Sequence, residues 1–233
     1  MFTGEVIQDT GVSQHVKQAV SSSFERIKQE GDVHTDLCKI MRKEKSDKGF
    51  GPYGKHNYTQ FYNDVFEPRR ESIERFLEIG LGTNNVDVPS NMGAGGTPGA
   101  SLRGWRSYFE HAKIFGGDVD RRILFEEDRI STFFIDQMDC EIIERALADL
   151  PAADFDVILD DGLHRYQANI NLHGIAKDHV KPGGYYIIED IHGSDENVGL
   201  FCNYLADIPN PSILINMPHQ RVIPDNLLAL IEY

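Results

Sequence analysis

The sequence predicts an α/β protein built on a doubly wound, mostly parallel sheet of the Rossmann-like type. From Ile73 onward, short apolar runs alternate with longer helical stretches, which is typical of a parallel sheet covered on both faces. Each of five runs ends in acidic or glycine residues, and ligands bind beyond the carboxyl ends of such strands. We therefore expect these end residues along one rim. The runs are IERFLEIG, AKIFGGDVD, ISTFFIDQ, FDVILDDG and YYIIEDIH.

Three regions are expected along the chain. Residues 1–45 carry apolar side chains at helical spacing and predict an N-terminal helical appendage. Residues 46–72 include a stretch rich in Gly and Tyr, which predicts a lid or substrate loop. Residues 73–233 predict the α/β domain, whose tail offers one or two further strands, antiparallel at the sheet edge. The side chains expected to act in the lid are Lys48, His56 and Tyr58.

Composition limits the compartment and the partners. A chain of 233 residues with 40% apolar side chains can bury a sizeable core. No run approaches the roughly 20 apolar residues of a membrane span, and the N-terminus lacks the pattern of a signal peptide, so we expect a cytoplasmic protein without a membrane partner. The net charge of −14 argues against nucleic acid as a partner. The three cysteines have no CxxC spacing and predict neither disulfides nor zinc.

The first two runs predict a site for a nucleoside. Gly80 and Gly82 follow the first run and let a ligand approach the backbone closely, although an ordinary tight turn is the alternative. Asn85 stands where the third glycine of GxGxxG would fall, which argues against a dinucleotide. Asp118 ends the second run, where a carboxylate can accept hydrogen bonds from both ribose hydroxyls.

The third run ends in a second set of candidate nucleoside contacts. Asp136 is placed to accept a hydrogen bond from an adenine amino group, with Gln137 beside it. Helix capping is the alternative for Asp136 and the preferred interpretation of Asp139, because a helix is expected to begin there.

The last two runs bring carboxylates together. Asp160 and Asp161 end the fourth run, and Glu189 and Asp190 end the fifth. Ends of adjacent parallel strands lie about 5 Å apart, and such crowding of like charge needs a cation or a shared proton. Oxygen ligands favour magnesium or calcium, and zinc is disfavoured because no cysteine joins the cluster.

Two histidines follow these carboxylates. His164 lies three residues past Asp161, and an imidazole is suited to general-base work near neutral pH. His192 is either a partner behind the site or a helix cap. The isolated His111, His173 and His179 are interpreted as structural.

Together these residues resemble the macrocin and mycinamicin type of sugar O-methyltransferase, a group of metal-dependent class I enzymes. The resemblance covers roughly Ser46 to His192, and the pairing of DDGLH with a following IIED is its specific part. Its other elements are SDKG with His56 and Tyr58, FLEIGLG, GASLRGW and GGDVD. The segment 83–100 is longer than the usual class I connection, so its role stays open.

The resemblance implies the cofactors and the division of roles. S-adenosylmethionine is the implied cofactor, with magnesium on Asp161, Glu189 and Asp190 and with His164 as base. Asp161 and His164 are thus the expected catalytic residues, with His192 near the acceptor. The residues expected to bind the cofactor are Glu78, Gly80, Gly82, Ser101, Asp118, Asp136, Gln137 and Asp160.

The expected acceptor is a sugar hydroxyl of a nucleotide-linked sugar, a glycan or a glycosylated natural product. Two alternatives remain: transfer to nitrogen on a small phosphorylated or amino-sugar substrate, and a nucleoside-binding module without catalysis. The carboxylate cluster with His164 argues against the second, because binding adenosine needs neither. A homo-oligomer stays open.

Overall fold

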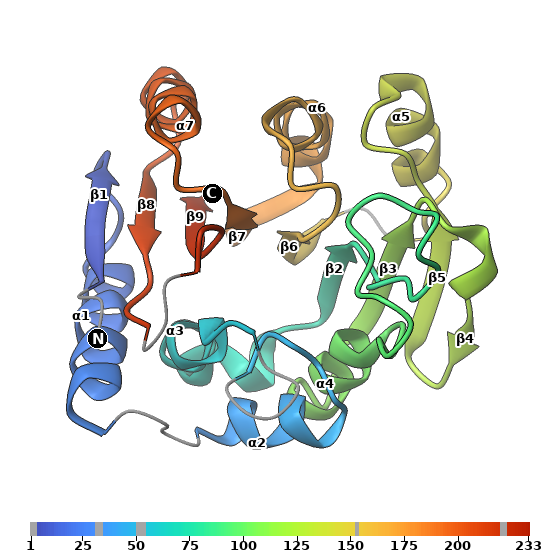
Figure 1. Cartoon of the computed structure of the whole chain (residues 1–233), viewed down its shortest axis with the longest axis horizontal. Coiled ribbons are helices and arrows are strands. Elements are labelled where there is room, and N and C mark those ends of the chain that lie inside the picture. The colour runs from blue at the N-terminus through green and yellow to red at the C-terminus, as the bar shows by residue number, and fades with distance from the viewer. Residues whose placement is uncertain (1–3, 31–34, 50–54, 152–153, 220–222) are drawn as a thin grey trace.

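A computed structural model describes residues 4–30, 35–49, 55–151, 154–219 and 223–233. These residues form a nine-stranded sheet in the order β1-β8-β9-β7-β6-β2-β3-β5-β4 (Figure 1). The strands are β1 (Glu5–Asp9), β2 (Arg75–Ile79), β3 (Lys113–Asp118), β4 (Glu126–Glu127), β5 (Ile130–Phe134), β6 (Phe155–Asp160), β7 (Val180–Ile191), β8 (Ser212–Asn216) and β9 (Leu227–Glu232).

The centre of the sheet is parallel, as the sequence predicts. β2 pairs with β3 and β6, β3 pairs with β5, and β6 pairs with β7, all in parallel. The five predicted runs supply these five strands, and the α/β fold is confirmed.

The tail strands are antiparallel, as expected, but their predicted place at the edge is wrong. β9 lies between β7 and β8, and β1 pairs with the outer side of β8. β8 is buried over most of its length, whereas β1 is exposed or half-buried throughout. On this side of the sheet, the partly polar β1 is the edge strand and has the exposure that an edge strand must tolerate.

Helices cover both faces of the sheet. In Figure 1, α5, α6 and α7 lie on one face, and α1, α2, α3 and α4 lie on the other. Among the described helices, none is long and apolar enough to cross a membrane. The helices are α1 (Gln14–Glu30), α2 (Asp36–Lys43), α3 (Tyr58–Phe66), α4 (Ala100–Tyr108), α5 (Cys140–Ala148), α6 (Tyr166–Ala176) and α7 (Asp195–Asp207), with short 3-10 turns η1 (Glu67–Ser72), η2 (Arg121–Ile123) and η3 (Lys177–His179).

The N-terminal region is more than a helical appendage. It contributes the edge strand β1 as well as α1 and α2. Val16, Leu37 and Met41 are fully buried and belong to the same apolar cluster as Trp105 of α4. Burial of these side chains against the sheet stabilises the segment. The boundary between residues 45 and 46 stays a prediction.

The segment 46–72 also differs from the predicted loop. Residues 50–54 lie outside the described part, but α3 and η1 occupy residues 58–72. α3 is buried on most sides, and its Phe61 and Tyr62 reach the apolar cluster. Tyr58 and Tyr62, which favour a loop interpretation in the sequence, are buried residues of this helix.

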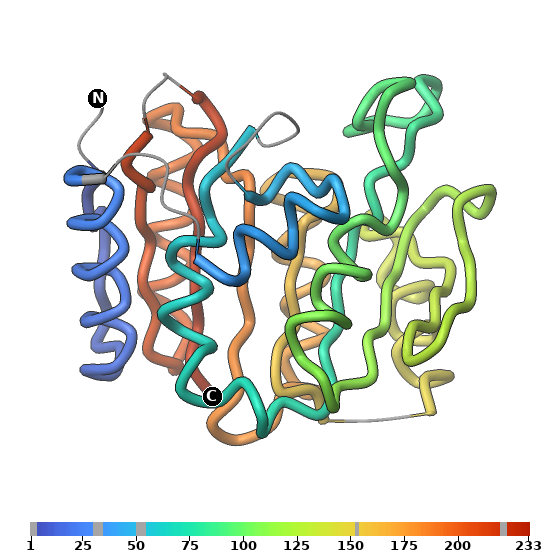
Figure 2. Tube along the Cα trace, turned by 90° about the horizontal axis from the view of Figure 1, so that it is seen from below, coloured from blue at the N-terminus to red at the C-terminus, as the bar shows by residue number. Residues whose placement is uncertain are grey.

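The segment between β2 and α4 projects from the body of the molecule (Figure 2). Its ends are closed by backbone bonds, from Met92 N to Thr83 O at 2.9 Å and from Gly99 N to Leu81 O at 2.7 Å. Thr83 Oγ1 also donates to Asp120 Oδ2 at 2.6 Å. The long insertion is therefore an anchored loop beside the carboxyl ends of the strands.

Candidate functional site

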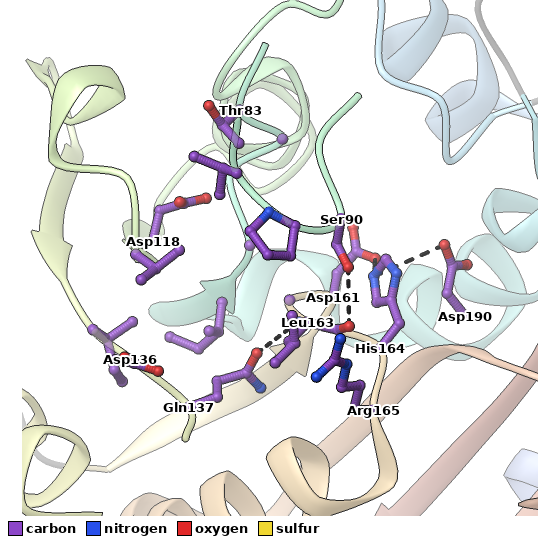
Figure 3. A pocket seen from close by; sticks show the side chains of 18 of the residues that line it. Thr83, Ser90, Asp118, Asp136, Gln137, Asp161, Leu163, His164, Arg165 and Asp190 are labelled. Atoms are coloured by element: carbon purple, nitrogen blue, oxygen red, sulfur yellow. Dashed lines mark hydrogen bonds and ion pairs between the residues drawn. The ribbon is translucent and has the colours of Figure 1, made fainter. Parts of the chain in front are cut away.

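A cavity of about 360 Å³ opens at the carboxyl ends of the central parallel strands. Its walls come from the turns after β2, β3, β5 and β6, from the end of β7 and from the segment 83–92. Figure 3 shows Asp118, Asp136 and Gln137 on one side and Asp161, His164 and Asp190 on the other. We call the first side the nucleoside end and the second the acid end.

The glycine turn forms the floor between the two ends. Gly80 has a φ of +100°, and a Cβ there would lie 1.9 Å from the carbonyl oxygen of Asp161. Because that atom belongs to backbone, no side chain fits at this position. Both Gly80 and Gly82 line the pocket, as expected of a turn over which a ligand lies.

Asp118 lies at the nucleoside end and organises it. Its Oδ2 accepts the Leu81 N–H at 2.7 Å, and its Oδ1 accepts the Asp120 N–H at 2.8 Å. Burial raises the pKa of this carboxyl, although these backbone hydrogen bonds act in the opposite direction. The residue lines the pocket, and each oxygen retains a lone pair for a further donor.

Asp136 and Gln137 also line the nucleoside end. Gln137 ties two turns together, because its Oε1 accepts the Leu163 N–H at 2.8 Å and its Nε2 donates to Asp160 at 2.7 Å. Asp139 accepts the N–H groups of Glu141 and Ile142 at the start of α5, which confirms it as a helix cap.

Three residues expected to bind the cofactor do not line the pocket: Glu78, Ser101 and Asp160. Glu78 is fully buried and accepts a hydrogen bond from Trp105 Nε1 at 3.0 Å. Asp160 is fully buried between the amides of Gln137 and Asn169. Glu78 and Asp160 lie within their strands and Ser101 lies in the first turn of α4, all three buried, so these residues support the pocket from behind.

The acid end joins two strand ends that are distant in sequence. His164 Nε2 lies 3.2 Å from Asp161 Oδ1 and 3.9 Å from Asp190 Oδ2. Six described non-glycine residues have a positive φ, and three of them, Ser90, His164 and Asp190, line this pocket. Strained backbone of this kind concentrates at functional sites.

Glu189 is separated from its neighbour Asp190. It is 1% exposed and does not line the pocket. Tyr62 donates to its Oε1 at 2.6 Å, and Lys48 contacts its Oε2. The structure thus brings Asp161 and Asp190 together with His164, and it holds Glu189 behind them.

The expected lid residues are buried behind the acid end rather than placed over the pocket. Lys48 contacts Glu78, Asp161 and Glu189. Tyr58 donates to Asp190 Oδ1 at 2.8 Å, and His56 Nε2 lies 3.3 Å from the same atom. His192 is exposed and accepts the Ser194 N–H just before α7, which fits the capping alternative.

Asp47 is a pocket residue that the sequence argument did not single out. It lines the acid end with Asp161 and Asp190, and burial together with the charge of Asp161 raises its pKa. Its position beside Lys48 in the SDKG motif is the only signal that pointed to it. Tyr62 was also missed, because its partner Glu189 is 127 residues away in the sequence.

Burial and neighbouring charges shift the pKa values of the titratable groups at the acid end. Burial lowers the pKa of His164, but the hydrogen bond and the negative charge of Asp161 outweigh burial and raise it to about 9. Burial and the charge of Asp161 raise the pKa of Asp190 to about 6. Burial opposes ionisation of Asp161, but Lys48 and His164 hold the pKa of that carboxyl below its usual range.

These residues fit a divalent cation in part. One donor atom each from Asp161, His164 and Asp190 lies within 4.8 Å of the others, and these residues line the pocket. Two carboxylates and an open side toward the pocket suit a hard cation that keeps other oxygen ligands. The oxygens of Glu189 already have other partners, so its role as a ligand stays a prediction.

Comparison with solved structures shows the fold. The MycE methyltransferase from the mycinamycin biosynthetic pathway, in complex with Mg and SAH, aligns with a TM-score of 0.64 at 24% identity, over 95% of this chain and 63% of that chain. An O-methyltransferase from Bacillus cereus in complex with SAH aligns with a TM-score of 0.55 at 11% identity, over 94% of this chain and 100% of that one. The chain has the fold of the class I methyltransferases.

Sequence comparison narrows the resemblance. An 8-demethyl-8-alpha-L-rhamnosyl tetracenomycin-C 2'-O-methyltransferase from Streptomyces olivaceus is 33% identical over 146 residues, 63% of this chain and 36% of the relative. Mycinamicin VI 2''-O-methyltransferase from Micromonospora griseorubida is 35% identical over 141 residues, 58% of this chain and 32% of the relative. The chain therefore spans about a third of the length of these relatives. No family model matches it. The resemblance to sugar O-methyltransferases is confirmed.

Proposed function

We propose that this chain transfers a methyl group from S-adenosylmethionine to a hydroxyl of a sugar. The sugar is part of a glycosylated natural product, a glycan or a nucleotide-linked intermediate. One observation carries the proposal: a single pocket joins the glycine turn and Asp118 at its nucleoside end to Asp161, His164 and Asp190 at its acid end. Binding of a nucleoside alone does not need the acid end.

The nucleoside end accounts for cofactor binding. Asp118 has lone pairs for the ribose hydroxyls, and Asp136 lies further along the same wall for the adenine. Val119, Ile135 and Met138 add apolar surface around these carboxylates. The turn at Gly80 leaves the backbone bare between this end and His164, so the methionine part of the cofactor lies toward the acceptor.

The acid end accounts for acceptor activation. Asp161 and Asp190 would hold magnesium, which when bound lowers the pKa of an acceptor hydroxyl and offsets the charge of the carboxylates. The pKa of His164 is raised to about 9, so His164 holds a proton near neutral pH while no metal ion offsets the negative charge of Asp161 and Asp190. To act as a base, Nε2 must be neutral, so His164 accepts the hydroxyl proton only where that negative charge is offset. The pocket then sets the oxygen in line with the methyl carbon.

The proposal is tested by binding and transfer on the purified chain. Calorimetry with S-adenosylhomocysteine measures the nucleoside end alone. Transfer of labelled methyl from S-adenosylmethionine to a panel of rhamnosides, other glycosides and amino sugars, with Mg²⁺ or with a chelator, measures the acid end. We expect product on a sugar oxygen that disappears with the chelator and returns with Mg²⁺.

Each arm of this experiment has an opposing result. Absence of S-adenosylhomocysteine binding overturns the cofactor assignment. Full transfer in excess chelator would show that the reaction needs no metal. Product found exclusively on an amino group would support transfer to nitrogen in place of transfer to oxygen.

A further inference from the structure

We propose that Lys48 is an internal counter-cation of the acid end. Lys48 pairs with Glu189 and with one oxygen of Asp161, so that a divalent ion binds to Asp161 and Asp190 only. The same pairing lets the chain fold without that ion. This inference rests on the proposed metal-assisted function and assigns a positioning role to a residue behind the pocket.

Lys48 joins three carboxylates from three strand ends. Its side chain is 2% exposed. Nζ lies 3.1 Å from Glu78 Oε1, and it also contacts Asp161 Oδ2 and Glu189 Oε2. Nζ donates hydrogen bonds to Asp161 and Glu189, and its contact with Glu78 is an ion pair.

The backbone fixes the lysine in this place. Its N–H donates to Ser46 Oγ at 3.3 Å, and its carbonyl oxygen accepts the Thr59 N–H at 3.4 Å, at the start of α3. α3 also supplies Tyr62, which binds the second oxygen of Glu189. One segment therefore brings both groups that occupy Glu189.

Burial of these carboxylates favours a cationic partner. Glu78 is fully buried, and Glu189 is 1% exposed. Buried carboxylates without a partner cost several kcal/mol each, and removing one partner of a buried pair leaves the other uncompensated. Among the described residues, Lys48 is the cation that contacts both of them.

The lysine also divides the oxygens between core and pocket. Asp161 turns Oδ2 to Lys48 and Oδ1 to His164, and Asp190 presents Oδ2 on the side of His164. Each oxygen of Glu189 already has one of these buried partners, and the residue does not line the pocket. A cation entering from the pocket thus meets two carboxylates, and the third is already neutralised.

Lys48→Met tests this division with Mn²⁺ as the probe, followed by spectroscopy of the free ion and by thermal melts. The metal-free variant should melt lower than the wild type. It should also bind Mn²⁺ at least about tenfold more tightly, because the released Glu189 oxygen and the extra negative charge favour a cation. Mn²⁺ should accordingly raise its melting temperature more than that of the wild type.

Lys181→Met is the matched control. Lys181 also bridges carboxylates, with Nζ 3.0 Å from Asp156 Oδ1 and 3.4 Å from Glu74 Oε2, but it does not line the pocket. Its loss should lower the melting temperature without a change in Mn²⁺ affinity. If Lys48→Met behaves in the same way, Lys48 is only a structural ion pair and the proposal is overturned.

The double variant Lys48→Met with Glu189→Gln keeps the test possible if Lys48→Met alone fails to fold. It should recover most of the melting temperature and return Mn²⁺ affinity to about the wild-type value, and failure of both overturns the proposal. If the wild type binds no Mn²⁺, the metal is no longer part of the proposed function. In that case Mn²⁺ binding by Lys48→Met would still support the role of Lys48, and lack of Mn²⁺ binding by Lys48→Met would reject that role as well.

Discussion

The two ends of the pocket are built in different ways. At the nucleoside end, Asp118 binds the N–H groups of Leu81 and Asp120, and Asp136 binds the N–H of Met138 two residues on. At the acid end, Asp190 and Glu189 are held by tyrosines from α3, more than 120 residues earlier in the chain. One end is organised by its own turns, and the other is assembled by tertiary packing.

This difference predicts different responses to mutation. Side chains at the nucleoside end contact the backbone that forms the pocket, so their loss should weaken cofactor binding. Side chains at the acid end share charge with several partners, so their loss should change reactivity and leave the nucleoside end in place. Three sets of substitutions test whether the two ends separate in this way.

The largest effect is expected at His164. His164→Gln retains a polar side chain but removes the base, so turnover should fall by roughly 10² to 10⁴ while affinity for S-adenosylhomocysteine stays nearly unchanged. Steady-state transfer assays and calorimetry on the same preparation measure both quantities. His111→Gln is the control, because His111 is exposed and pairs with Glu71 on the surface. Loss of cofactor affinity with turnover retained would make His164 a structural residue.

The same difference explains what the sequence could predict. The glycine turn, Asp118, Gln137 and the cap at Asp139 follow strand ends and helix starts, where local pattern determines position. DDGLH and IIED were placed correctly at adjacent strand ends, because parallel neighbours bring such ends together. The five central strands were predicted for the same reason.

Three features could not be predicted because they depend on long-range packing. The sequence gives Glu189 and Asp190 the same status, but a register irregularity between Ile188 and Ile191 and the positive φ of Asp190 separate their environments. Lys48 and Tyr58 lie in a segment whose composition is typical of a loop, and only the packing of α3 shows that they are buried partners of Glu78 and Asp190. β1 has a partly polar sequence because an edge strand is partly exposed to solvent, so no buried apolar run marks it as a strand.

A smaller effect is expected at Asp118. Asp118→Asn retains one carbonyl acceptor but loses the negative charge, so affinity for S-adenosylhomocysteine should fall by about 1–3 kcal/mol. Asp156→Asn is a matched control, because Asp156 Oδ2 also accepts two backbone N–H groups, of Glu74 and Arg75, each at 2.9 Å. It lies outside the pocket, so that variant should lose stability and retain affinity. Equal affinities for the two variants would remove Asp118 from the cofactor site.

The smallest effect separates two aspartates at the same turn. Asp139→Ala removes the cap of α5 and should lower the free energy of unfolding by about 1 kcal/mol, because the N–H groups of Glu141 and Ile142 lose their acceptor. Its affinity for S-adenosylhomocysteine should not change. Asp136→Ala should do the reverse, since Asp136 lines the pocket and its side chain accepts the Met138 N–H within its own turn. Urea unfolding and calorimetry on both variants decide the matter: a loss of stability without a loss of affinity in Asp136→Ala would make that residue a second cap, and adenine recognition would then rest on Gln137 and the neighbouring backbone.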